Sequence, residues 1–147
     1  MKLNRYNKQA SDKALAATLI HEVMHCVLLD IYTRAHQGDK TACENILSFK
    51  LNKNDSSNFF NNEYFVLMNS GETGHHELMY QLFYPYMVSL LERFAVIHKV
   101  VFSEQDAERL MWSGLQKTIA YTKLPNKEKK DIDFAILKAK GIDIEED

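Results

Sequence analysis

Cysteine, proline and glycine are scarce in this chain of 147 residues, which contains two cysteines, two prolines and five glycines. Two cysteines, Cys26 and Cys43, are too few for a disulfide framework or a four-cysteine zinc module. We expect Cys26 to be a small core residue, because it falls within an apolar stretch. Since proline and glycine are the residues that interrupt helices most often, their scarcity favours a mainly helical chain.

Excess charge of one sign is also missing, because the formal net charge is −2. No overall positive field would therefore draw the protein to nucleic acid or to an anionic membrane. The N-terminus lacks the apolar segment of a signal peptide, and we expect no apolar run to approach the roughly 18 residues of a membrane span. For the chain as it stands these features predict a cytoplasmic protein without a membrane or nucleic-acid partner. The length predicts one domain over residues 1–147, ending in a frayed acidic tail at 142–147.

The pattern of apolar and capping residues predicts a first long helix from Ser11 or Asp12 to about His36, with Ser11 as its N-cap. A short helix at 41–49 and long helices at 75–97, 103–122 and 126–140 are expected after it. We expect Pro85 to kink the helix that contains it, because proline cannot donate a backbone hydrogen bond. Between 51 and 74 the chain is expected to be a loop with at most a short hairpin at 59–60 and 64–68. The predicted fold is mainly α, with at most a small hairpin or a reduced sheet.

The stretch TLIHEVMHCVLL, residues 18–29, places ionisable side chains inside the first long helix. Apolar residues surround nearly the whole circumference of this helix, so we expect it to be enclosed by protein. Thr18, His21, Glu22 and His25 are three or four residues apart and share one stripe of the helix. A buried helix with a single polar stripe is expected to face an internal cleft.

His21 and His25 are four residues apart, so their side chains point within about 40° of each other on a helix. Both imidazoles can then reach one zinc ion at the roughly 2.0–2.1 Å of a zinc–nitrogen bond. Glu22 is not a ligand in this pattern, but it can reach a water in the open position of the metal and act as a general base. H-E-x-x-H at this place predicts a hydrolytic zinc centre.

A catalytic zinc site usually has three protein ligands. The metzincin pattern would need glycine and histidine where this chain has Leu28 and Ile31, so that class is excluded. A glutamate about twenty residues after the motif is the third ligand of thermolysin-like sites, and Glu44 is close to that spacing. Its surroundings lack a following acidic partner for a histidine, so we rank Glu44 second.

The preferred third ligand comes from the segment TGHHELMYQLF, at the predicted start of another helix. His76 fits slightly better than His75, because it lies four residues before Tyr80 and leaves Glu77 to support the ligands. His75 remains an alternative ligand or a substrate contact. Tyr80 is a candidate hydrogen-bond donor to a developing oxyanion, although packing is the more common role of such a tyrosine.

The segments ASDKALAATLIHEVMHCVLL, GHHELM and MWSGLQKT, within residues 10–118, resemble those of SprT-like and related zincin metallopeptidases of bacterial or phage type. The resemblance implies a zincin-like fold, with His21, His25 and His76 as zinc ligands and Glu22 as the catalytic base. It also implies hydrolysis of a peptide or protein substrate. In SprT proteins the third histidine follows sooner and many carry a cysteine-rich zinc module, so DNA-associated proteolysis is not carried over.

Zincins usually have strands before the active-site helix, whereas only about ten residues precede it here. The sheet is therefore expected to be reduced, missing, or part of a longer parent protein. Related domains occur at the end of large secreted bacterial proteins, which makes a delivered effector module the alternative to a cytoplasmic enzyme. Two other functions stay open, namely a catalytically silent zincin-fold module that holds structural zinc for binding or assembly, and a metal-free helical interaction domain.

Overall fold

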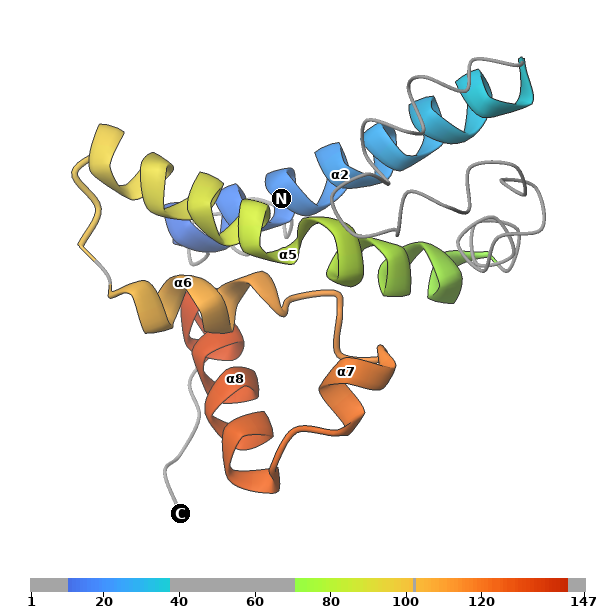
Figure 1. The fold of residues 1–147 in the computed structure, drawn as a ribbon. Coiled ribbons are helices and arrows are strands. Elements are labelled where there is room, and N and C mark those ends of the chain that lie inside the picture. The colour runs from blue at the N-terminus through green and yellow to red at the C-terminus, as the bar shows by residue number, and fades with distance from the viewer. Residues whose placement is uncertain (1–10, 38–70, 102, 143–147) are drawn as a thin grey trace, which may run out of the picture. The chain divides into compact units, whose positions relative to one another are not determined.

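A computed structural model of the protein describes residues 11–37, 71–101 and 103–142. These residues form helices and no strand, which confirms the mainly α fold for this part of the chain (Figure 1). The helices are α2 (Asp12–His36), α5 (Glu72–Ile97), α6 (Glu104–Met111), α7 (Ile119–Thr122) and α8 (Asn126–Ala139). The predicted helix at 41–49, the predicted hairpin and Cys43 lie outside the described residues.

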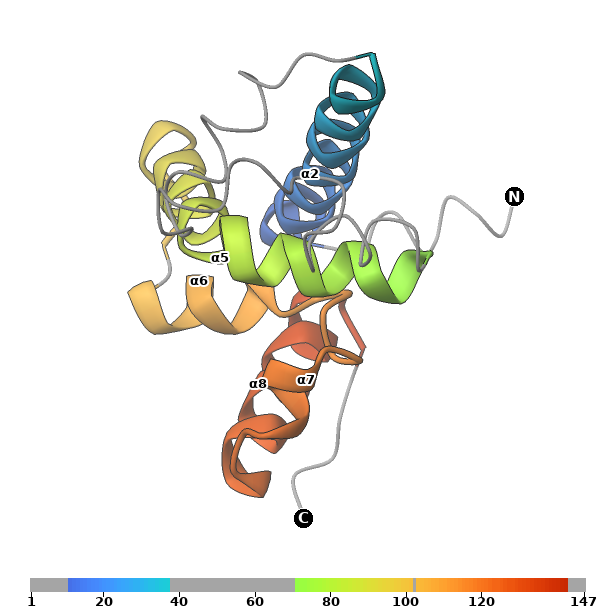
Figure 2. The same cartoon turned by 45° about the vertical axis from the view of Figure 1, so that its right-hand side comes forward.

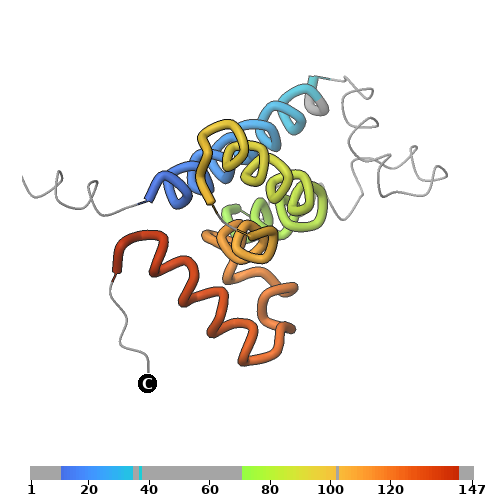
Figure 3. Tube along the Cα trace, turned by 90° about the vertical axis from the view of Figure 1, so that its left-hand side faces the viewer, coloured from blue at the N-terminus to red at the C-terminus, as the bar shows by residue number. Residues whose placement is uncertain are grey.

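The chain divides into two compact units, one made of residues 1–21 and 85–147 and the other of residues 22–84. Helices α2 and α5 each run without a break through the residues at which the units divide (Figure 3). The first unit contains the beginning of α2, the end of α5 and all of α6, α7 and α8. The expectation of one domain over residues 1–147 stays a prediction.

Helix α2 begins at the predicted residue, because Ser11 acts as its N-cap. The Ser11 Oγ accepts a hydrogen bond from the amide of Ala14 at 3.3 Å and donates one to the carbonyl of Ala139 at 2.8 Å. A backbone hydrogen bond from the Ser11 amide to the same carbonyl, at 2.9 Å, adds to this contact. The start of α2 is thereby fixed to the end of α8 within the first unit.

The burial of α2 differs from the expectation. Most of its buried residues follow one stripe with a spacing of three or four, Ala14, Ala17, His21, Met24 and Leu28, while Ala16 is buried outside this stripe. The expectation that the helix is enclosed on all sides is wrong, because apolar residues on the opposite face are exposed, Leu19 to 65%. Apolar composition around a helix shows what could be buried, but the number of neighbouring elements decides what is buried.

The exposed face of α2 also contains Cys26, which is a free and exposed thiol rather than a core residue. Cys26 lies three residues after Val23 and seven after Leu19, so it shares their side of the helix. Thr18 and Glu22 are exposed as well, and the expectation that the whole polar stripe lines an internal cleft is wrong for these two residues. Of the residues in that stripe, His21 is buried and His25 is half-buried.

The expectation that no apolar run approaches the length of a membrane span is wrong. From Asp12 to Arg34, α2 is long and apolar enough to meet the length and composition criteria of a membrane-crossing helix. Core helices of proteins that never enter a membrane meet the same criteria, so this is a weak indication.

Helix α5 begins at Glu72, three residues before the predicted start, and ends at Ile97 as predicted. Pro85 lies inside it and has no amide hydrogen for the carbonyl of Gln81, yet the helical conformation continues on both sides. Leu78 and Met79 are fully buried in the second unit. In the first unit the fully buried residues of this helix are Met87 and Leu91.

The predicted helix over 103–122 is wrong in its middle, because the chain leaves the helical conformation after Met111. Helix α6 begins where predicted, with the Ser103 side chain accepting from the amide of Asp106 and the Asp106 side chain accepting from the amide of Ser103. A turn follows α6 and contains Gly114 with φ +83°. A positive φ does not fit an α-helix, and glycine adopts it at no steric cost. The single turn of α7 then begins after its N-cap Thr118.

Helices α6 and α8 pack against each other in the first unit (Figure 1), and α7 lies beside α8 (Figure 2). Side-chain hydrogen bonds join the α7 region to α8, because Asp133 Oδ1 accepts from the Tyr121 hydroxyl at 2.6 Å and from Gln116 Nε2 at 3.0 Å. Burial and the neighbouring Asp133 carboxylate raise the pKa of Tyr121 to about 12. Helix α8 ends before Gly141, as predicted, and Gly141 has φ +74°.

Candidate metal centre

Two of the predicted ligands meet in the second unit. The Nε2 atom of His25, on α2, lies 3.1 Å from the Nε2 atom of His76, near the start of α5. The two rings have centroids 5.0 Å apart and are tilted by 54°. His76 is buried and His25 is half-buried, so the facing nitrogens are partly shielded from water.

His21 belongs to the same helix as His25, one turn earlier. It is 8% exposed, and one ring nitrogen from each of His21, His25 and His76 lies within 4.8 Å of the other two. A shared tetrahedral zinc ion would hold its nitrogen ligands about 3.3 Å apart, given zinc–nitrogen bonds of roughly 2.0–2.1 Å. The distance between the Nε2 atoms of His25 and His76 is close to this value. Since all three nitrogens lie within 4.8 Å of one another, a shift of about 1.5 Å at most would give the other pairs the same spacing. The cluster is therefore close enough to hold a single metal ion.

Electrostatics favour the form of histidine that binds a metal. Burial lowers the pKa of His25, and the nearby His75 lowers it further, while the carboxylates of Glu22 and Glu72 act in the opposite direction. Burial also lowers the pKa of His76, as does the neighbouring His25. A lowered pKa keeps an imidazole neutral at physiological pH, and only a neutral imidazole has a free electron pair for a metal.

Glu22 occupies the position that the H-E-x-x-H pattern gives to the general base. It follows His21 directly on α2 and is exposed, so its carboxylate is open to water. Its charge acts on both His25 and His76, which places the carboxylate within electrostatic reach of the histidine pair. A carboxylate can act as a general base towards a water molecule within its reach.

The other residues predicted for the site are His75, Glu77, Tyr80 and Glu44, and none of them belongs to the close cluster of histidine nitrogens in the described part of the chain. The ring centroid of His75 is 6.0 Å from that of His25, and His75 does not belong to the close nitrogen cluster. Glu77 is buried directly after His76 on α5. The half-buried ring of Tyr80 lies 5.1 Å from that of Tyr84, which is a packing contact. Glu44, the alternative ligand, lies outside the described residues.

Sequence reasoning missed two residues near the candidate centre. Glu72 acts electrostatically on His25 and His76, and it lies one helical turn before His76. The late predicted start of α5 left Glu72 in a loop, although an acidic residue at such a position is a typical first-turn residue. Gly114 contacts His21 closely, and the only signal for it was the glycine in the weak segment MWSGL.

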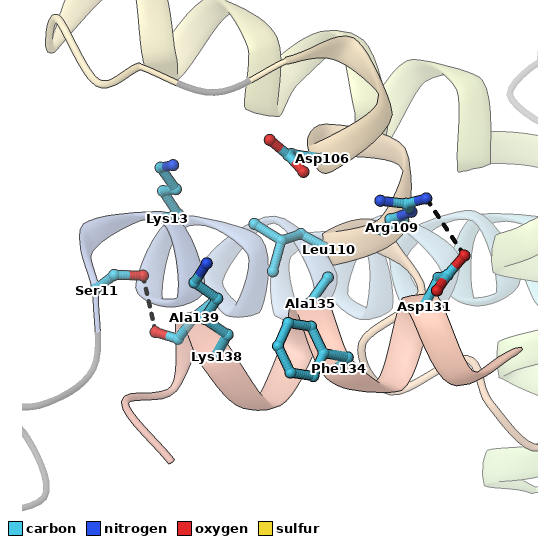
Figure 4. Close-up of a pocket in the computed structure, with 10 residues that line it drawn as sticks. All are labelled: Ser11, Lys13, Asp106, Arg109, Leu110, Asp131, Phe134, Ala135, Lys138 and Ala139. Carbon is cyan, nitrogen blue, oxygen red and sulfur yellow. Dashed lines mark hydrogen bonds and ion pairs between the residues drawn. The ribbon is translucent and has the colours of Figure 1, made fainter. Parts of the chain in front are cut away.

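A separate cavity of about 430 Å³ lies in the first unit, between the beginning of α2, α6 and α8 (Figure 4). Leu110 and Phe134 form part of its apolar lining. At its edge Arg109 forms an ion pair with Asp131 at 3.6 Å, and the Lys13 ammonium, also in the lining, donates to the carbonyl of Val101. None of the residues predicted for the zinc centre lines this cavity.

Comparison of the chain with protein-family models, with curated proteins and with solved structures finds no match.

Proposed function

We propose that the protein is a zinc-dependent hydrolase of the H-E-x-x-H type, with a peptide bond as the bond that it cleaves. The observation that carries this proposal is the approach of one nitrogen each from His21, His25 and His76 to within 4.8 Å. Three imidazoles with a glutamate beside them are the residues of a catalytic rather than a structural zinc site, because a structural site has four protein ligands and needs no base.

In this proposal each residue has a separate role. His21, His25 and His76 would hold the ion through one nitrogen each. Zinc bound by three imidazoles would supply a Lewis acid that lowers the pKa of water towards neutrality and polarises a carbonyl group. A Glu22 carboxylate oxygen accepts the proton of the attacking water and returns it to the leaving amine nitrogen.

The peptidase class is supported by the motif segments rather than by the geometry alone. The resemblance to SprT-like and related zincins joins HEVMH, HHELM and MWSGL, and the structure brings the first two of these segments into contact through His25 and His76. A zincin-like identity and a peptide or protein substrate therefore belong to this proposal.

Metal content tests the proposed site directly. The zinc bound per chain is measured in protein purified without added metal and again after incubation with zinc, for the wild type, His76→Ala and His75→Ala. We expect about one zinc per wild-type chain, retention in His75→Ala and loss in His76→Ala. His75 is a matched control, because it is the adjacent histidine on the same helix turn and lies outside the close cluster. A wild-type protein that takes up no zinc would contradict the proposal.

Glu22→Gln separates the enzyme from the main alternative, a silent module that holds zinc for binding or assembly. The substitution keeps the shape of the side chain but removes its ability to accept a proton. We expect the variant to bind zinc like the wild type and to lose hydrolysis of a mixed peptide library by at least about 100-fold. Zinc binding without wild-type hydrolysis of any peptide would favour the silent module.

A further inference from the structure

We propose that Gly114 is a positioning residue for His21, and this inference rests on the proposed metal site. Both residues belong to the first unit. A Cβ atom built at Gly114 would lie 2.7 Å from His21 Cε1 and 3.1 Å from both ring nitrogens. Carbon atoms in contact are normally at least about 3.5 Å apart, so any side chain at residue 114 would overlap the imidazole. The ring of His21 occupies the space that the missing side chain leaves.

The backbone at Gly114 is also one that other residues rarely adopt. Gly114 lies in the turn between Trp112 and Leu115, which is closed by a hydrogen bond of 2.8 Å from the Leu115 amide to the Trp112 carbonyl. Its φ of +83° at the third residue of the turn favours glycine. This turn follows the end of α6, and Gly114 within it lies against the His21 ring.

The turn is held firmly on both sides, so it cannot easily move away from an added side chain. Trp112 is 6% exposed and Leu115 is fully buried. The Trp112 ring packs edge-on against the Tyr121 ring with centroids 5.6 Å apart, and the Tyr121 hydroxyl is hydrogen-bonded to Asp133 of α8. The His21 imidazole, in contrast, is the end of a side chain with two rotatable bonds. A substitution at Gly114 should therefore displace the imidazole rather than the turn.

Displacement of the His21 ring would leave His25 and His76 close together while it removes the third nitrogen. Gly114 would thus act on the metal through His21, without any contact of its own to the ion. Substitutions in the shell around metal ligands typically lower metal affinity by about 10- to 100-fold. We expect a loss in this range for any residue with a side chain at 114.

The test compares Gly114→Asn with Gly71→Asn. Asparagine tolerates a positive φ better than other residues with a side chain, so backbone strain stays small in both variants. Gly71 is a matched control, because its φ is +80° and nothing lies within 4 Å of a Cβ built there. Zinc affinity is measured by competition with a chelator, and the Co²⁺-loaded proteins are compared by their visible absorption, which reports the number and geometry of ligands.

We expect Gly71→Asn to match the wild type in zinc affinity and Co²⁺ spectrum, and Gly114→Asn to bind zinc about 10- to 100-fold more weakly with an altered spectrum. Equal affinity and an unchanged spectrum for Gly114→Asn, beside a wild type that binds zinc, would overturn the role of Gly114 and leave the metal site intact. A wild type that binds neither ion would overturn the metal site itself, and with it the role of Gly114.

A second measurement needs no metal and covers the case in which Gly114→Asn folds poorly. The effect of Gly114→Asn on the unfolding midpoint is measured with His21 present and again in a His21→Ala background. If the imidazole is what the new side chain meets, the loss of stability should shrink in the His21→Ala background to the value for Gly71→Asn. An equal loss in both backgrounds would show that the turn itself, rather than His21, requires glycine, and would overturn the inference.

Discussion

Replacing Tyr121 by phenylalanine tests how firmly the region after α6 is tied to α8. The substitution keeps the ring that packs against Trp112 and removes the hydroxyl that donates to Asp133 at 2.6 Å. Hydrogen bonds to charged groups contribute about 1.5–3 kcal/mol. Asp133 keeps its bond from Gln116 Nε2, so we expect a value in the lower part of this range, about 2 kcal/mol at pH 8.

The stabilisation by Tyr121 should also depend on pH in a definite direction. The pKa of Tyr121 rises from 10.0 to about 12 in the folded protein, so the folded state prefers the protonated phenol. The contribution is fully present below pH 10, where the phenol is protonated in both states. It declines as the pH rises from about 10 to about 12, because the unfolded state then ionises first. At pH 11 the loss approaches about 1.4 kcal/mol, and partial access of solvent reduces it to about 1 kcal/mol.

The assay is urea unfolding of the wild type and Tyr121→Phe at pH 8 and pH 11, followed by circular dichroism. Titration of lysines affects both proteins alike, so the difference between their free energies of unfolding isolates Tyr121. Tyr86→Phe provides a matched control at an exposed tyrosine, where we expect less than about 0.5 kcal/mol at either pH. A difference for Tyr121→Phe that stays constant between the two pH values, or grows, would refute the reasoning.

Three further predictions concern the cap of α6, the core and the metal. Ser103→Ala removes the side chain that accepts from the Asp106 amide and should lower the free energy of unfolding by about 1 kcal/mol in urea titrations. Met79→Ala, at a fully buried residue, should cost about 2–5 kcal/mol, whereas Val96→Ala at an exposed residue of the same helix should stay within about 0.5 kcal/mol. Adding EDTA should lower the unfolding midpoint of zinc-loaded wild type in calorimetry but leave that of His25→Ala unchanged, because metal that binds only the folded state stabilises it.

The helices were largely predictable from local sequence signals, but which of their faces are buried was not. Ser11, Ser103 and Gly141 mark helix ends through short-range hydrogen bonds or backbone conformation, so their positions could be read from the sequence. The exposure of Cys26 could not, because it depends on whether another element covers that face of α2. The broken helix after Met111 was missed for a related reason, since a glycine in an otherwise helical pattern is compatible with either a helix or a turn.

The candidate site was predictable where its residues share one helix. The spacing of His21 and His25 fixes their relation through helix geometry alone. The choice between His75 and His76 could not be made from helix geometry alone, because it depends on how the first turns of α5 are oriented, and α5 begins earlier than expected. The contact of Gly114 with His21 joins residues 93 positions apart, and a glycine leaves no chemical signal of what lies beside it.

The close approach of the His21 ring to Gly114 restricts which mutations the gene can accept. Every single-base change of a glycine codon that replaces the residue introduces a Cβ atom or ends the chain, so only synonymous changes preserve the open space. Histidine 21, by contrast, can be lost in many ways without disturbing residue 114. We therefore expect a library of random variants selected for zinc binding to retain glycine at 114 as strictly as histidine at 21, while a library selected for folding alone would lose the histidine first.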